Sequence, residues 1–484
     1  MLPAKPTDEE GNSDTETHME SQQQQIKSHP ASSRVTKFCL NQFKPEVLAQ
    51  QQTTVLHTLA LLKETISGFK TEDIRTVCEH LLSIMTAANV LLRTNCLQAL
   101  HQLFLSRTTN LNGLLCAKLL TAIHEYRPDR TDYRQTLAWL TVLKEGHIHL
   151  SKLDLNLCIN ALPIFVEVCC TDLWLSDRTD IISGVSNALK EMMYECVKPA
   201  CETEELANTY RVAISKIIMS VHKVLSAPFG EVAKYVVLTF SIIFEVCGPY
   251  FSKELSSSLL ELAKRYDTQS ALRIQIEHAI ISAIKAMGPE IVLKSIPLTN
   301  AKGEVLLEKS WLLPLLREGA AGASFKFFKE VILALALDCN KKWHKFAEEK
   351  QVSMSHTYEL LCCQLWGLFP GFCKSPKDPE NFRLIAPTLG NALDNNPEFR
   401  APIFDGLIEL IQNEEQTVIH EALGKYAKNF LPRLFNIYTQ KPNGTYEQDL
   451  RKKSLEVIKV RDLILFTLFN YIVLFIFLFE CSCI

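Results

Sequence analysis

Glycine is scarce in this chain, with 17 residues among 484. A β-rich architecture needs many turn residues with positive φ, a conformation that glycine adopts without strain. The scarcity therefore argues against sheets and favours helices joined by short polar links. Hydrophobic residues make up 47% of the sequence and charged residues 22%, which is the balance of a folded protein and not of a disordered one.

An excess of one charge is also missing, because 51 Lys and Arg face 54 Asp and Glu. No global field drives the chain to nucleic acid or membranes, so any RNA contact must come from a local patch. A secretory signal is missing too, since no basic segment followed by an apolar run opens the chain. The 16 cysteines are scattered within apolar runs, where reduced thiols act as small hydrophobes, and this pattern indicates an intracellular protein.

Motifs for catalysis are absent from the sequence. It has no glycine-rich phosphate loop with Lys and Ser or Thr, no nucleophile elbow and no HExxH pattern. His147 and His149 stand two apart and Cys196 and Cys201 five apart, but no paired CxxC spacing supplies four zinc ligands. We therefore expect no catalytic residue, no metal and no cofactor, and a protein that is not an enzyme.

Composition divides the chain into three parts. Residues 1–33 are rich in Glu, Asp, Ser and Thr and contain the run Gln22 to Gln25, which predicts a disordered polar leader. Residues 34–455 show amphipathic segments of about 15 to 22 residues separated by short polar breaks. Residues 456–484 form a basic and then hydrophobic tail.

Two neighbouring segments show the helical pattern. The apolar residues between Ile181 and Cys196 recur three or four positions apart, which places them on one face of a helix that Lys198-Pro199 ends. Glu204 and Glu205 then open a second helix, where their charge suits the N-terminal dipole, and its apolar stripe runs to Val224. A link this short predicts an antiparallel pair.

Similar pairs can be proposed along the whole region, with Pro128, Pro163, Pro199 and Pro228 near the breaks. Their spacing predicts two-helix repeats, and HEAT or armadillo repeats fit better than tetratricopeptide repeats, whose Trp, Gly, Tyr and Ala signature is missing. A single pair would leave an apolar face in water, so the pairs must stack. The predicted fold is all-α, a HEAT/armadillo-like helical-repeat solenoid, or α-α superhelix.

Two clusters of basic residues are candidate binding sites. Cations surround an aromatic residue in the first cluster, a combination that grips phosphates and stacks on bases; its members are Lys326, Lys329, Lys341, Lys342, Trp343 and Lys345. The alternative is a solvated helix face, because charge runs are common on solenoids. Arg451, Lys452 and Lys453 form a short candidate nuclear-import signal.

The tail contains a 17-residue apolar stretch, residues 463–479, flanked upstream by Lys459 and Arg461. It meets the lower length limit for a membrane span, and the basic flank fits a tail anchor. The alternative is an artefact of the gene model, because Phe and Ile dominate the stretch without the stripe seen in the repeats.

Two segments combine tryptophan with proline: Trp311 to Arg317 and Leu365 to Cys373. Physically these are core helices that a proline ends or kinks. As sequences, WLLPLLRE at 311–318 and QLWGLFPGFCKSPKD at 364–378 resemble the central signature of the ribosomal RNA processing protein twelve family. TLAWLTVLKEGHIHL at 136–150 resembles its N-terminal repeats, and NFLPRLFN at 429–436 resembles the close of its conserved core.

This resemblance covers about residues 35–455 and implies a function without catalysis. It implies a karyopherin-like HEAT solenoid of the nucleolus and nucleus that shuttles to the cytoplasm, binds pre-ribosomal particles, and supports rRNA processing, subunit maturation and nuclear export. The implied partners are rRNA, assembly-factor proteins and the GTPase Ran. Family members continue past residue 455, so the resemblance also implies an N-terminal fragment with an aberrant C-terminus.

Two other functions stay open at this point. An importin-like nuclear transport receptor would show the same stacked helical pairs and the same Ran binding. A tail-anchored membrane adaptor would depend on residues 463–479 alone.

Overall fold

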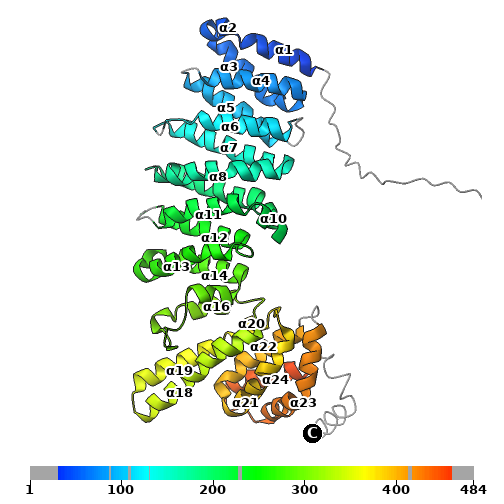
Figure 1. The fold of residues 1–484 in the computed structure, drawn as a ribbon. Helices are drawn as coiled ribbons and strands as arrows, with labels where there is room; N and C mark the ends of the chain where they lie inside the picture. Colours follow the sequence, from blue (N-terminus) through cyan, green and yellow to red (C-terminus); the bar gives the residue numbers. More distant parts are fainter. Residues whose placement is uncertain are drawn as a thin grey trace, which may run out of the picture. The chain divides into compact units, whose positions relative to one another are not determined.

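The computed structural model describes residues 31–459 except 87–88, 107–110, 130, 227–229, 231 and 413–416, and Figure 1 shows its ribbon. The described residues form helices joined by short turns, and their extended pairing is limited to an isolated antiparallel bridge between Thr299 and Val305. The prediction of an all-α fold is confirmed. The predicted tail stretch 463–479 and all but the last three residues of the predicted leader lie outside the described part.

The chain divides into two compact units, residues 1–115 and 116–484. In the first unit α3 packs against α1, α2 and α5, and α4 packs against α1 and α5. Leucines such as Leu59, Leu81 and Leu100 are buried between these helices. The helices of this unit are α1 (Ser32–Gln42), α2 (Pro45–Gln50), α3 (Gln52–Thr65), α4 (Thr71–Met85) and α5 (Val90–Leu105).

The second unit contains the remaining helices, of which α6 begins just before the division. They are α6 (Gly113–Glu125), α7 (Tyr133–Leu153), α8 (Leu155–Thr171), α9 (Thr179–Met192), α10 (Glu204–Thr209), α11 (Arg211–Leu225), α12 (Ala233–Cys247), α13 (Ser252–Thr268), α14 (Arg273–Met287), α15 (Pro289–Ser295), α16 (Leu312–Gly319), α17 (Phe325–Phe327), α18 (Ala334–Glu348), α19 (Val352–Trp366), α20 (Phe369–Cys373), α21 (Phe382–Asn395), α22 (Arg400–Gln412), α23 (Thr417–Thr439) and α24 (Thr445–Lys459).

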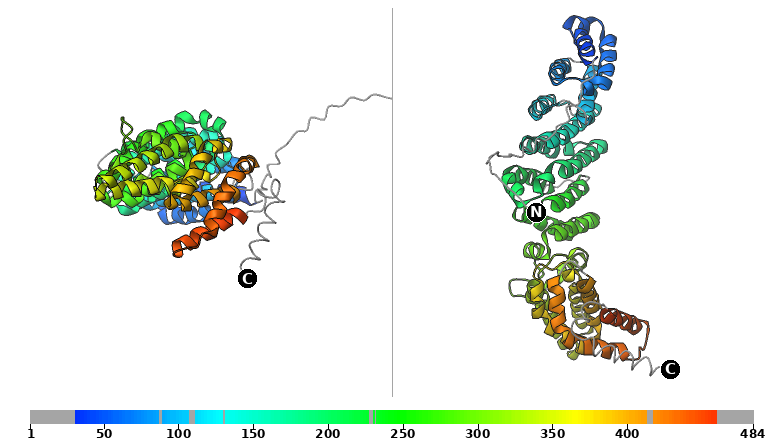
Figure 2. Two further views of the ribbon diagram at one scale, coloured as in Figure 1. Left: turned by 90° about the horizontal axis from the view of Figure 1, so that it is seen from below. Right: turned by 90° about the vertical axis from the view of Figure 1, so that its right-hand side faces the viewer.

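Helices of the second unit stack in two layers, because most of them pack against the next helix of their own layer. We call α7, α9, α12, α14, α16, α20, α22 and α24 the first layer. We call α8, α11, α13 and α15 the second layer, which α17, α21 and α23 continue. The right-hand view of Figure 2 shows both layers. The predicted stacking of helical pairs is confirmed, since most helices pack against neighbours from other repeats.

Short polar residues begin many of these helices. Asp132, Asp154 and Thr203 each accept a hydrogen bond from a backbone N–H in the first turn that follows. An N-cap of this kind satisfies one of the amides that a helix start leaves unpaired. The polar breaks seen in the sequence therefore act as start signals.

The two segments used as examples above are helical, with two differences. The first continues past α9 as a π-turn, Met193–Val197, before Pro199 opens a short 3₁₀ turn. The second is interrupted at Tyr210, which separates α10 from α11. Both irregularities insert residues between two regular helices, and the apolar spacing did not indicate them.

Proline marks the breaks less regularly than predicted. Pro163 lies inside α8 and not at its end. A proline inside a helix costs one hydrogen bond and crowds the preceding turn; here packing of α8 against α7 and α11 holds the helix together. Pro314 lies in the first turn of α16 and Pro370 in that of α20, so these prolines begin the helices that they were predicted to end or kink.

Large aromatic residues fill the core between the layers. Trp139 and Trp174 are fully buried, and the indole N–H of Trp139 donates to the carbonyl oxygen of Ile123 at 2.8 Å. Trp366 stacks on Phe399 with ring centroids 5.0 Å apart, as expected for a packing residue. The thirteen buried cysteines of the described part lie in the cores of the two units.

One helical stretch of the described part is long and apolar enough to cross a membrane, Leu155–Leu175, which comprises α8 and the turn after it. Its Cys158, Leu162, Phe165 and Cys169 are buried against neighbouring helices. Its apolar character is therefore explained by its position in the core.

Candidate functional site

The predicted basic cluster lies on one helix that runs without interruption from Phe325 to Glu348. It consists of α17, a π-turn at Phe328–Leu333 and α18. Figure 1 shows α18 beside α19, with which it forms a hairpin. The two helices of the hairpin pack mainly on each other, and the buried residues of α18 are Leu335, Ala336 and Cys339.

Asp378, from the loop before α21, anchors the start of this helix. Its carboxylate accepts hydrogen bonds from the Ser324 hydroxyl at 2.8 Å and from the backbone N–H groups of Phe325 at 2.6 Å and Lys326 at 3.1 Å. Burial favours a higher pKa for Asp378, but the hydrogen bonds from Asn381, Ser324 and these amides outweigh it, and the pKa lies below its usual value. The carboxylate therefore stays charged and caps the helix.

The helix separates the predicted cluster into two groups. Lys326 and Lys329 lie near its start and are exposed. Lys341 lies 15 residues after Lys326, which corresponds to about 22 Å along a helix. The lysines therefore form two small cationic sites and not one patch.

The three lysines of the second group differ in their exposure and in their ion pairs. Lys341 and Lys345 are exposed, and they share one side of the helix because they are four residues apart. Lys342 is bound to Asp338 at 2.9 Å and lies over the ring of Tyr358 at 5.5 Å. The hydrogen bond to Asp338 raises the pKa of Lys342, so this lysine is already neutralised within the protein.

Aromatic rings accompany the lysines of the second group. Trp343 is half-buried and stacks on His344, with ring centroids 4.9 Å apart and planes at 15°. Phe346 stacks on Tyr358 of α19 at 5.5 Å, and the Ser355 hydroxyl of α19 donates to the carbonyl oxygen of Trp343 at 3.3 Å. The aromatic pairs thus fix the outer end of the hairpin.

The turn between α18 and α19 is tightly defined. Gln351 N–H donates to the carbonyl oxygen of Phe346 at 2.8 Å, and Lys350 N–H donates to that of Ala347 at 3.1 Å. This pair of bonds is a Schellman motif, which places its central residue in the left-handed region. Lys350 takes that place with φ 61°, although glycine adopts it more easily.

Carboxylates limit the charge of the hairpin end. Lys345 Nζ lies 3.8 Å from Glu349, while the side chain of Lys341 makes no ion pair within the described part of the chain. The arrangement can hold one or two phosphates beside a stacked Trp343 and His344. It is too small for broad electrostatic capture.

The candidate nuclear-import residues lie in α24, and two of them are engaged by the fold. Arg451 lies over the ring of Tyr438 at 4.9 Å, and Lys453 forms an ion pair with Asp405 of α22. Lys452 is exposed and bonds to Asp449 at 3.2 Å. A receptor that reads all three side chains would therefore have to displace contacts of α24.

A groove across the first layer, lined by polar residues together with Leu238 and Ile242, was not predicted. It has a volume of about 500 Å³ and crosses α9, α12 and α14. Its wall includes the hydrogen bond from the Tyr194 hydroxyl to Glu245 at 2.8 Å and the contact of His278 with Ser241 at 3.1 Å. The two contacts join residues 51 and 37 positions apart, so only an alignment of successive repeats with one another could have revealed the groove.

Metal chemistry finds no support in the geometry. Within residues 31–459 and outside the gaps given above, no three side chains of His, Cys, Asp or Glu gather as a metal site would require. His147 is buried against Phe165, with ring centroids 5.5 Å apart, and burial together with nearby His124 lowers its pKa to about 3. It is therefore a neutral core residue.

Two stacked layers of paired helices define a helical-repeat protein of the armadillo type. The family model of the Ribosomal RNA-processing protein 12 HEAT repeats matches residues 175–441, which is more than half of the chain. The chain belongs to this family, as the resemblance in sequence predicted.

Curated relatives agree with this assignment. The chain is 64% identical over 460 residues to the RRP12-like protein of Drosophila melanogaster, covering 95% of this chain and 33% of that protein. It is 32% identical over 446 residues to the RRP12-like protein of Homo sapiens, covering 89% and 34%. The chain thus spans about a third of the length of these relatives. Among solved structures, a crystal structure of importin beta in an ammonium sulfate condition matches with a TM-score of 0.40 and 10% identity, covering 89% of this chain and 53% of that one.

Proposed function

We propose that the chain is a non-catalytic scaffold of ribosome biogenesis that binds pre-ribosomal particles through its helical surfaces and supports rRNA processing and subunit maturation or export. Membership in the Ribosomal RNA-processing protein 12 family carries the proposal. Stacked helices offer long surfaces to RNA and to assembly-factor proteins. The place of action is the nucleus and nucleolus, with shuttling to the cytoplasm.

Sedimentation tests this function. The tagged full chain is expressed in cells, and nuclear extracts are separated on sucrose gradients. We expect co-sedimentation with pre-ribosomal particles that carry precursor rRNA. A chain that stays at the top of the gradient in every extract contradicts the proposal. Tight binding to Ran in its GTP form, with release of a bound protein, would instead support a transport receptor.

Within this function, the end of the α18–α19 hairpin is the proposed RNA contact. Lys341 supplies one exposed cation, Lys345, whose Nζ lies 3.8 Å from Glu349, supplies a second, and Trp343 with His344 supplies a stacked pair of rings. For single-stranded RNA the logarithm of affinity falls with the logarithm of salt by about 0.7 for each phosphate contacted. Two lysines that each contact one phosphate therefore account for a fall of about 1.4 in the logarithm of affinity per unit of the logarithm of salt.

The matching experiment measures the affinity of a uridine oligomer at several salt concentrations. We expect the double variant Lys341→Glu and Lys345→Glu to bind more weakly and with a shallower slope. The control variant, Lys326→Glu and Lys329→Glu, carries the same charge change at the other end of the helix, and it should keep the slope of the unaltered chain if the contact lies at the hairpin. An unchanged slope in the first variant removes the hairpin end from the interface.

A further inference from the structure

The outward surface of the second layer repeats a pattern on neighbouring helices. In α11 the exposed residues are Val212, Lys216, Met219 and Lys223, and in α13 they include Lys253, Ser257, Leu260 and Lys264. Both sets follow the spacing of one helix face. Because α11 packs against α8 on one side and α13 on the other, these faces lie next to one another.

Three successive helices of this surface each expose an apolar side chain near their middle. Ile164 of α8 is 60% exposed, Met219 of α11 is 44% exposed and Leu260 of α13 is 45% exposed. The buried residues two positions before them and two positions after them match as well: Leu162, Ile217 and Ser258, and Val166, Val221 and Leu262. We call Ile164, Met219 and Leu260 the apolar row.

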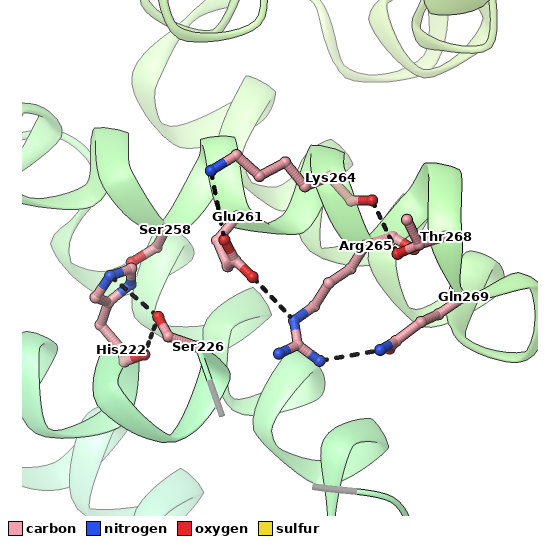
Figure 3. A network of polar contacts seen from close by, with 8 residues as sticks. All are labelled: His222, Ser226, Ser258, Glu261, Lys264, Arg265, Thr268 and Gln269. Carbon is pink, nitrogen blue, oxygen red and sulfur yellow. Dashed lines mark hydrogen bonds and ion pairs between the residues drawn. The ribbon is translucent and has the colours of Figure 1, made fainter. Parts of the chain in front are cut away.

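Direct contacts keep α11 and α13 in this register. Near their starts, Arg211 Nη1 donates to Glu254 Oε1 at 2.6 Å. Farther along, His222 Nδ1 lies 3.0 Å from the hydroxyl of Ser258, and Figure 3 shows these two side chains meeting between the helices. These contacts pair residues 43 and 36 positions apart, values that bracket the separation of Met219 and Leu260, so the two residues lie at similar heights on their helices.

Positive charge flanks the two members of the apolar row on α11 and α13. Lys216 and Lys223 lie one helical turn before and after Met219, and Lys264 lies one turn after Leu260. No Asp or Glu occurs in α11. The carboxylate of Glu261 in α13 is held between Lys264 at 3.8 Å and Arg265 at 3.4 Å (Figure 3). The surface around Met219 and Leu260 is therefore cationic, whereas the exposed Glu167 lies one turn after Ile164.

We propose that the apolar row and its lysines dock an acidic amphipathic helix of a protein partner. Packed helices lie 8–10 Å apart, and seven residues of a helix advance about 10.5 Å. A partner helix laid across α8, α11 and α13 thus places one apolar residue of every seven on Ile164, Met219 and Leu260. Its acidic residues then meet Lys216, Lys223 and Lys264.

The chemistry of the surface favours a protein over RNA. RNA is gripped by aromatic rings and by arginine planes that stack on bases, and the exposed positions of α11 and α13 hold neither. Exposed Met and Leu contribute nothing to phosphate binding, whereas they suit an apolar helix face. A docked helix also forms its own backbone hydrogen bonds, which the side chains of a helical surface could not supply.

A designed peptide serves as the probe. It is about 20 residues long and helical, with leucine at every seventh position, glutamate beside each leucine and alanine elsewhere. A control peptide has the same composition with its leucines spread around the helix. Fluorescence anisotropy with the full chain should give a dissociation constant on the order of 10 µM for the first peptide, as for small transient interfaces, and at least about tenfold weaker binding for the second.

Three variants of the full chain locate the binding. We expect Met219→Asp with Leu260→Asp, and separately Lys216→Glu with Lys223→Glu, to weaken binding of the first peptide about tenfold. Ile274→Asp with Lys285→Glu alters one exposed apolar residue and one exposed lysine of α14 in the first layer, and it should bind like the unaltered chain. Circular dichroism confirms that each variant is folded.

Other outcomes overturn the proposal. Equal binding of both peptides, or full binding by both second-layer variants, shows that the apolar row is not the site. If a uridine oligomer loses affinity with Lys216→Glu and Lys223→Glu but keeps it with Met219→Asp and Leu260→Asp, while the peptide does not bind, the surface serves RNA instead.

Discussion

The carboxylate of Asp378 accepts a hydrogen bond of 2.6 Å from the backbone N–H of Phe325, 53 residues earlier in the chain. The first amides of a helix have no partner within it, and a negative charge there also suits the helix dipole. The helix that carries the candidate RNA contact is therefore capped from a distant loop. Its start depends on the fold of α21 and the loop before it.

Loss of this cap should loosen the start of the helix. Asp378→Ala removes the acceptor for two backbone amides, and we expect a cost of about 1–2 kcal/mol, as for other helix caps. Hydrogen exchange of the amides of Phe325 and Lys326 should speed up accordingly. Asp378→Asn keeps one acceptor oxygen and should show a smaller effect. Unchanged exchange in Asp378→Ala would show that the bonds contribute nothing.

The contribution of Asp378 should depend on pH. Its pKa in the folded chain lies below the ordinary value of 3.8. A carboxyl group with a lowered pKa stabilises the fold above its unfolded pKa, and this contribution is lost as the pH falls through the folded value. The difference in stability between the unaltered chain and Asp378→Ala should therefore be constant above about pH 5 and shrink below 3.8, as measured by thermal unfolding.

Protonation of His147 should destabilise the chain at a higher pH than protonation of Asp378 does. Burial lowers its pKa to about 3 from an ordinary value of 6.5, so the unfolded chain binds the proton more readily. Stability then falls as the pH drops below 6.5, by about 2 kcal/mol at pH 5. Midpoints of thermal unfolding at pH 7.5 and pH 5 measure the loss.

The variant His147→Leu isolates this residue. Leucine fits the apolar surroundings beside Phe165 and cannot be protonated. We expect its unfolding midpoint to change less between the two pH values than that of the unaltered chain. An equal change in both would assign the acid sensitivity to other groups.

Two glycines should respond to alanine in opposite ways. A Cβ at Gly406 of α22 would overlap the ring of Phe369 in α20 and come within 3.0 Å of Cys373 Sγ. Crowding of a packed core costs about 1–3 kcal/mol, so Gly406→Ala should lower the unfolding midpoint. Gly424 of α23 has no such neighbour within 4 Å, and Gly424→Ala should stabilise its helix by about 0.5–1 kcal/mol. The same direction of change in both variants would contradict the packing described.

The hairpin turn offers a stabilising change. Lys350 holds φ 61°, where residues with a Cβ are strained and glycine is not. We expect Lys350→Gly to slow hydrogen exchange of the Gln351 amide and to stabilise the hairpin by about 1 kcal/mol. Lys350→Ala, which keeps the strain and removes the charge, is the control. A gain as large in alanine as in glycine would point to charge and not to backbone strain.

Much of the fold follows from the spacing of apolar residues. The stripe from Ile181 to Cys196 predicts α9 correctly, and the apolar excess of paired segments predicts their stacking, because no single pair can bury its own face. The break predicted near Pro163 does not occur, because packing of α8 on both sides outweighs the local cost of a proline. The π-turns could not be predicted either, because one inserted residue in a helix has no characteristic residue type in the sequence.

The candidate site was less predictable than the fold. Lys326 and Lys341 look like one cluster in the sequence, but a continuous helix places them about 22 Å apart. Neutralisation of Lys342 by Asp338 could have been foreseen from their spacing of four residues. The role of Asp378 could not, because it depends on contacts between segments 53 residues apart. The apolar row could not be predicted for the same reason, since its members come from three different repeats.

Contacts between neighbours of one layer hold the second unit together, with α9 against α7 and α12, and α12 against α14. Each such interface joins only adjacent repeats, so a mechanical load applied along the stack passes through all of them in series. The weakest interface should give way first and leave the rest intact. Stretching a single molecule would then release the chain in steps of roughly one repeat, about 40 residues, in place of one concerted rupture.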